Sequence, residues 1–111
     1  MPYERGDVVL LELPFSDGTA TKKRPALIVA NATYLASTSD LIVCAITSQT
    51  RAERIVGATA VRRWREARLL KRSVVKASIH TLDRASVYRR LGRLTTEDLA
   101  RVDESLKSVL F

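Results

Sequence analysis

The sequence has few of the residues that build metal centres, disulfides or phosphate-binding loops. Its 111 residues include one Cys, one His and four Gly. Cys44 cannot form an internal disulfide, and one Cys with one His is too few for the common three- or four-ligand metal sites. The four glycines are scattered, and no Lys-Ser or Lys-Thr pair follows any of them. These absences argue against metal-dependent and nucleoside-triphosphate-using enzymes, so we expect neither a metal nor another cofactor.

Long apolar runs are also absent. No stretch approaches the ~20 apolar residues needed to cross a bilayer, and the first residues lack the apolar segment of a signal peptide. We therefore expect a soluble, cytoplasmic protein that does not bind membranes. A length of 111 residues with 46% hydrophobic side chains is typical of one globular domain, here residues 1–111.

Positive charge is abundant and concentrated in the middle of the chain. Residues 51–93 contain 13 Lys or Arg and 3 Asp or Glu, whereas the segments before and after them are slightly acidic. Most of the cations are arginines, whose guanidinium groups suit bidentate contacts with phosphate. This segment predicts an acidic polymer as partner, although a solvated basic surface remains the alternative.

The pattern of apolar residues predicts a mainly β protein with a C-terminal α-helix. Residues 7–13, 26–30 and 41–46 are short apolar runs typical of strands. Weaker strand candidates are 54–61, 73–77 and 86–94, with an irregular or helical segment at 64–70 and a loop over 16–23. Thr95 is a good helix N-cap, and Leu99, Val102, Leu106 and Val109 form one apolar stripe. We expect a small, strongly bent sheet or barrel closed by this helix.

Polar residues flank two of the predicted central strands. Lys23 and Arg24 precede strand 26–30, whereas Thr47, Ser48 and Gln49 follow strand 41–46. By itself this pattern is common at the strand ends of soluble sheets.

An ordered set of motifs resembles the MazF/PemK toxin family. It comprises Arg5-Gly6-Asp7-Val8-Val9-Leu10, Asp17-Gly18, Arg24-Pro25-Ala26-Leu27-Ile28-Val29 with Asn31, Ile46-Thr47-Ser48, the segment 70–76, Thr81-Leu82-Asp83 and the segment 91–94. The set covers nearly the whole chain. The resemblance implies an SH3-like barrel of the kind shared by the CcdB, MazF and PemK toxins. It also implies a homodimer that cleaves single-stranded RNA without a metal and is blocked by a cognate antitoxin.

In this family Arg24 and Thr47 match the residues implicated in cleavage. An arginine can stabilise the charge that develops on a phosphate during attack by the 2′-hydroxyl, and the Thr47 hydroxyl can position the reacting groups. The residue that accepts the proton stays unassigned.

One segment departs from the family pattern. Ser78-Ile79-His80 stands where many members have Gln-x-Arg, so a substrate-contacting Arg is replaced by His80. His80 is either a general base, since imidazole titrates near neutral pH, or a polar strand-end residue bonded to the backbone or to Asp83. Further RNA contacts are expected from Lys76 and Ser78 beside His80, and from Lys23, Ser48 and Gln49.

Two other functions remain open at this point. The related CcdB group uses the same barrel to poison DNA gyrase, which would place function on the C-terminal helix. A non-catalytic RNA-binding regulatory module would explain both the basic segment and the missing Gln-x-Arg pair. Trp64, between Arg63 and Arg65, either stacks on an RNA base or covers the core.

Overall fold

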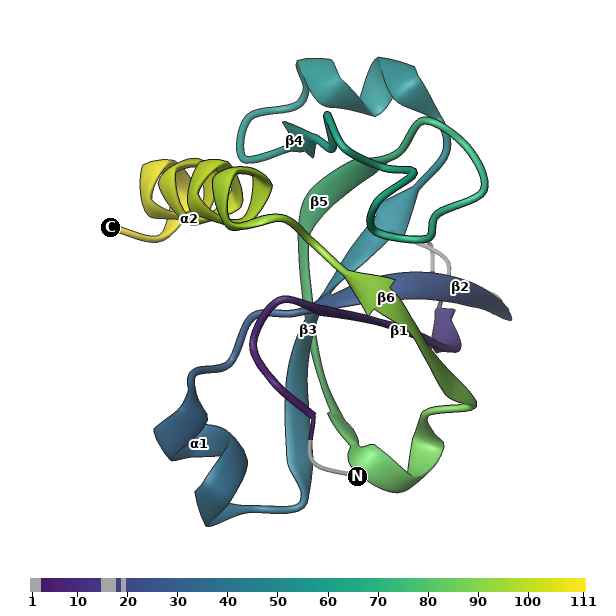
Figure 1. Cartoon of the computed structure of the whole chain (residues 1–111), viewed down its shortest axis with the longest axis vertical. Helices are drawn as coiled ribbons and strands as arrows, with labels where there is room; N and C mark the ends of the chain where they lie inside the picture. Colours follow the sequence, from purple (N-terminus) through teal and green to yellow (C-terminus); the bar gives the residue numbers. More distant parts are fainter. Residues whose placement is uncertain (1–2, 15–17, 19) are drawn as a thin grey trace.

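A computed structural model describes residues 3–14, 18 and 20–111 of the chain. Within these residues the fold is a curled, antiparallel six-stranded sheet with a long helix across one side (Figure 1). The strand order is β4-β5-β3-β2-β1-β6. The strands are β1 (Asp7–Pro14), β2 (Thr21–Ile28), β3 (Asp40–Thr47), β4 (Thr59–Ala60), β5 (Val74–Asp83) and β6 (Arg89–Arg93). The helices are α1 (Ala32–Ser37) and α2 (Thr96–Leu110), with 3-10 turns η1 (Thr50–Arg54) and η2 (Arg84–Ser86). The expected mainly β fold with a C-terminal helix is confirmed.

The sheet has a separate apolar core on each face, because its central strands are apolar on both sides. The first core lies under α2 and the connection between β4 and β5; its members include Leu27, Cys44 and Val102. The second core contains Ile28, Val43 and, from α1, Leu35, among other residues. Alternation along each strand assigns every side chain to one of these two faces. We call them the α2 face and the α1 face.

Helix α2 begins as the sequence predicts. The Thr95 hydroxyl accepts a hydrogen bond from the Asp98 backbone N–H at 3.2 Å, which caps the first turn. The Asp98 carboxylate is buried and accepts the backbone N–H groups of Arg62 and Arg63 at 3.2 and 2.9 Å. Asp98 therefore ties the connection between β4 and β5 to the helix.

Several predicted boundaries are wrong. Lys22 and Lys23 belong to β2 rather than to a loop, and Arg24 lies within the strand. The weak strand predicted over residues 54–61 shrinks to the two residues of β4, the strand predicted over 73–77 extends to Asp83, and β6 begins at Arg89. Helix α1 was not predicted. Of the loop residues 16–19, only Gly18 is among those described. No helix among the described residues is long and apolar enough to span a membrane.

Candidate active site

Arg24 and Thr47 lie on the same face of the sheet, the α1 face. Strands β2 and β3 pair through Ala26 with Ala45 and Ile28 with Val43. Arg24 pairs with Leu11 of β1, a member of the α1-face core, and Thr47 lies two residues after Ala45, so alternation places both on this face. The two residues matched to the family's cleavage motifs therefore share one face, although they are 23 positions apart in the sequence.

Strand β5 adds a row of polar side chains to the same face. Lys76, Ser78 and His80 are half-buried and alternate with exposed residues. Leu82, the next residue of the row, packs on the core of the α1 face, which fixes the direction of the whole row. These three residues therefore share the α1 face, and their contact with RNA stays a prediction.

A bulge shapes this row. Cys44 pairs with Ile79 and Ile46 with Val75, so five residues of β5 span three residues of β3. The two extra residues of β5 lie beside Ala45 of β3, so that Lys76 and Ser78 both lie next to Ala45. Bulges redirect side chains and are common beside active sites. Here the bulge places two polar side chains where a regular strand would place one.

His80 is bonded to Ser78. The Ser78 Oγ lies 3.0 Å from the His80 Nε2. His80 is in the middle of β5 rather than at a strand end, and the Asp83 carboxylate accepts instead from the Ser39 hydroxyl and the Ala85 backbone N–H. The proposed His80–Asp83 bond is therefore replaced by a bond within the polar row.

The other predicted contact residues lie at the margin of this group. The Gln49 backbone N–H donates to the Thr47 Oγ1 at 3.1 Å, which fixes the hydroxyl at the end of β3, and Ser48 and Gln49 are exposed. Lys23 points to the opposite face of β2 from Arg24, and its Nζ lies 4.2 Å from the centre of the Tyr88 ring. The structure thus separates Lys23 from the Arg24 row.

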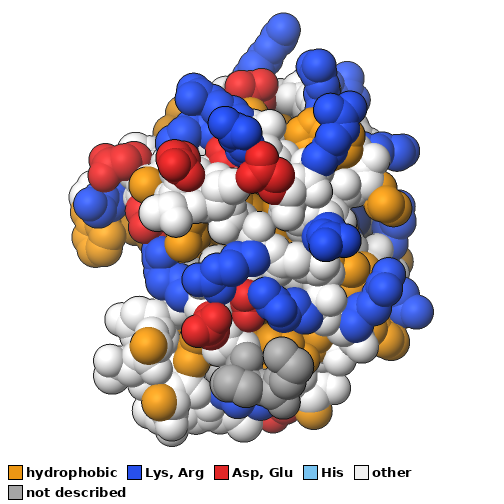
Figure 2. All heavy atoms as spheres, viewed as in Figure 1, with side chains coloured by type: hydrophobic (Ala, Val, Ile, Leu, Met, Phe, Trp, Pro, Cys, Tyr) orange, Lys and Arg blue, Asp and Glu red, His pale blue; other side chains and the backbone are white. Residues whose placement is uncertain are grey.

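Many arginines of the basic segment have structural partners. Arg84 donates to the carbonyls of Leu35 and Thr38 at 2.9 and 3.0 Å, and so closes the end of α1. Arg90 and Arg93 both pair with the buried Asp7. The other exposed arginines of this segment include Arg51, Arg54, Arg62, Arg65, Arg68, Arg72 and Arg89. In Figure 2, Lys and Arg side chains gather over the upper and right-hand parts of the molecule, whereas most acidic side chains lie toward α2.

Trp64 and Cys44 belong to the core rather than to a site. Trp64 packs against the core of the α2 face, with the Arg65 guanidinium 4.5 Å from its ring centre. Cys44 is fully buried, and desolvation raises the pKa of its thiol to about 12. A thiol that stays protonated is a poor nucleophile.

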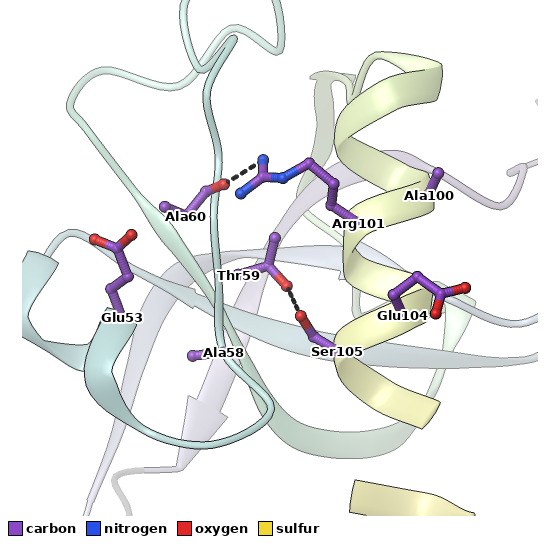
Figure 3. Close-up of a pocket in the computed structure, with 8 residues that line it drawn as sticks. All are labelled: Glu53, Ala58, Thr59, Ala60, Ala100, Arg101, Glu104 and Ser105. Atoms are coloured by element: carbon purple, nitrogen blue, oxygen red, sulfur yellow. Dashed lines mark hydrogen bonds between the residues drawn. The ribbon is translucent and has the colours of Figure 1, made fainter. Parts of the chain in front are cut away.

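A groove of about 480 Å³ lies on the other side of the sheet, between β4 and α2 (Figure 3). The Thr59 hydroxyl donates to the Ser105 Oγ across its floor at 2.7 Å, and Arg101 donates to the Ala60 carbonyl at 2.9 Å. Glu53 and Glu104 are its acidic lining residues. The groove is therefore on the face opposite the Arg24 row and poorly suited to a polyanion.

Comparisons with known proteins point to one family. The family model for the PemK-like, MazF-like toxin of type II toxin–antitoxin systems matches residues 4–110. An endoribonuclease in complex with its cognate antitoxin from mycobacterial species has a TM-score of 0.79 and 23% identity, covering 97% of this chain and 94% of that one. MazF in a MazE–MazF crystal structure from Deinococcus radiodurans has a TM-score of 0.75 and 22% identity, covering 99% and 97%. The Mycobacterium tuberculosis toxin MazF-mt6 has a TM-score of 0.71 and 21% identity, covering 92% and 93%. No curated protein sequence matched.

Proposed function

Because the chain belongs to the PemK-like, MazF-like family of type II toxins, we propose that it is a metal-independent endoribonuclease that cleaves single-stranded RNA, mRNA above all, in the cytoplasm. The observation that supports this proposal is that Arg24 and Thr47 lie on the same face of the sheet as the polar row of β5. Two of the similar solved structures are of proteins described as endoribonucleases.

The reaction proposed is an internal transesterification. The 2′-oxygen of one nucleotide attacks its own 3′-phosphate, the bond from phosphorus to the 5′-oxygen of the next nucleotide breaks, and the proton of the 2′-hydroxyl is lost while the 5′-oxygen gains one. The products are a 2′,3′-cyclic phosphate and a free 5′-hydroxyl. The atoms and electrons of this reaction balance without an oxidant, a reductant or an activated co-reactant.

Arg24 would stabilise the negative charge that grows on the phosphoryl oxygens. Arg24 is half-buried with its Nε buried, and a cation that is partly removed from water interacts more strongly with a developing charge than a fully exposed one does. The Thr47 hydroxyl already accepts the Gln49 N–H, so its own proton is available to a phosphate oxygen or to the 2′-hydroxyl. Arg24 would therefore stabilise the charge on the phosphate, whereas Thr47 would hold the reacting groups in position.

The test is cleavage of a long RNA in EDTA by purified wild-type and Arg24→Ala proteins, with the new ends mapped. Loss of Arg24 should slow cleavage by ~10²–10³-fold, as removal of a transition-state donor does elsewhere. Lys107→Ala is the control, since it removes an equal charge from an exposed position on α2. A folded Arg24→Ala protein that cleaves at the wild-type rate would refute the assignment. A wild-type protein that cleaves no RNA would refute the proposed activity.

The proposal includes a cognate antitoxin and a homodimer. A second copy requires an apolar surface, and exposed apolar side chains gather where the η1–β4 turn meets β5 and the end of α2: Ile55, Val56, Ile79, Val109 and Leu110. A Cβ at Gly57 would touch both Ala77 and Val109, which shows how closely these elements pack. Light scattering should give twice the chain mass. Growth arrest on expression should require Arg24 and be relieved by the antitoxin.

A further inference from the structure

The bond between Ser78 and His80 determines which ring nitrogen can meet RNA. Residues 78 and 80 are two apart on a strand, so both side chains project from the α1 face. The Ser78 Oγ engages Nε2 at 3.0 Å. Nδ1 is therefore the nitrogen that can contact a ligand: it donates in the tautomer in which the Ser78 hydroxyl donates to Nε2, and it accepts in the tautomer in which Nε2–H donates to the Ser78 Oγ.

The position of His80 along the sheet separates it from the cleaved bond. His80 pairs with Val43, four residues along β3 from Thr47. At about 3.3 Å per residue this offset is roughly 13 Å. A general base must come within about 2.6–3.2 Å of the hydroxyl that it deprotonates. With the phosphate held between Arg24 and Thr47, His80 lies beside a neighbouring nucleotide instead.

The residues between these two points suit an RNA strand that runs along β5. Lys76 and Ser78 flank Ala45 at the bulge, between the Thr47 end of the sheet and His80. Lys76 brings a positive charge to this interval, which favours a phosphate there. The imidazole at the end of the row is half-buried and held by Ser78, so it presents one hydrogen-bonding edge in a fixed direction.

We propose that His80, oriented by Ser78, is a specificity-determining residue whose Nδ1–H donates a hydrogen bond to an acceptor on the base of a nucleotide near the cleaved bond. Single-stranded RNA exposes the edges of its bases to such contacts. A fixed donor discriminates by position, because a base that presents an amino group there leaves the donor unpaired. This inference rests on the proposed ribonuclease activity.

Substitutions that keep one nitrogen position or the other test the inference. The side-chain amide of His80→Asn places nitrogen near Nδ1, whereas that of His80→Gln places it near Nε2; His80→Ala removes both. Each variant would cleave an RNA library with randomised flanks, the cut ends would be sequenced, and kcat and KM would be measured on one good substrate. Circular dichroism would confirm that each variant is folded.

We expect the asparagine variant to retain the wild-type base preference. The glutamine and alanine variants should lose about threefold to tenfold of the preference at one flanking position, as expected for one neutral hydrogen bond. Their kcat on the good substrate should change less than KM. Ser78→Ala should weaken the same preference, because the ring loses its fixed orientation.

Two results would overturn the inference while leaving the proposed activity intact. An unchanged cleavage pattern in His80→Ala would show that the imidazole does not read a base. A fall of 10²-fold or more in kcat, with loss of the acidic limb of the pH–rate profile, would show a general base instead. If the wild-type protein cleaves nothing, the proposed activity itself fails, and this inference fails with it.

Discussion

Replacing Asp98 with alanine should strongly destabilise the protein, because one buried carboxylate serves three donors. It accepts the backbone N–H groups of Arg62 and Arg63, and it pairs with the Arg101 guanidinium at 2.8 Å. The carboxylate is 2% exposed and Arg101 is 32% exposed. Removal of one partner from a buried charged network costs about 3–5 kcal/mol. Two N–H groups left without an acceptor, at about 1–3 kcal/mol each, give a sum of roughly 2–6 kcal/mol, which is centred on the same value.

A loss of this size is a large part of the roughly 5–15 kcal/mol that stabilises a small domain. Urea unfolding followed by circular dichroism, at one fixed protein concentration, measures it. Glu104→Ala is the matched control, since it removes from the same helix a carboxylate whose ion pair with Lys107 is exposed. The control should change the free energy of unfolding by less than about 0.5 kcal/mol. A loss below about 1 kcal/mol for Asp98→Ala would refute the reasoning.

Two further changes test the packing of the sheet. Because burial raises the Cys44 pKa to about 12, the folded protein keeps this proton above pH 9 while the unfolded chain loses it. The free energy of unfolding should fall by about 1.4 kcal/mol more between pH 8 and pH 10 than it does in Cys44→Ala; equal slopes would contradict this. A Cβ on Gly92 would lie 2.3 Å from the Ala67 carbonyl oxygen. Gly92→Ala should therefore lower the free energy of unfolding by about 1–3 kcal/mol. An unchanged melting temperature would show that the Ala67 carbonyl moves away from the added Cβ at no cost in stability.

The elements with strong local signals were predictable from the sequence. Strand β3 reads as an unbroken apolar run because both of its faces are buried. Helix α2 combines a Thr95 cap with an apolar stripe, and both features appear in the structure. In each case neighbouring residues alone determine the local structure.

Other elements depend on partners that are distant in the sequence. Lys22, Lys23 and Arg24 resemble a loop, yet they form a strand because each pairs with a residue of β1. Pro25 is tolerated there although it lacks an N–H, because the pairs that β2 makes with β3 begin at Ala26. Helix α1 has a clear N-cap in Asn31, but its six residues are too few to show a helical period. Pairing across the sheet thus overrides local preference.

The candidate site was only partly predictable. The sequence identifies its residues, but it does not show which residues of other strands lie beside them. Alternation alone places Lys76, Ser78 and His80 on one face of a strand. The strand beside them, and the two-residue bulge that offsets His80 from Thr47, follow from pairings between β3 and β5 that the sequence does not encode locally.

The apolar core determines which face the cleavage residues occupy. Ile28 and Val43 pair on the α1 face and are fully buried there, and Ala26 with Ala45 follows on the same face. A slip of one residue in either strand would turn these side chains outward and expose them, so the register is strongly fixed. Arg24 and Thr47 are each two residues beyond the last of these pairs. Their placement on one face is therefore a consequence of core packing.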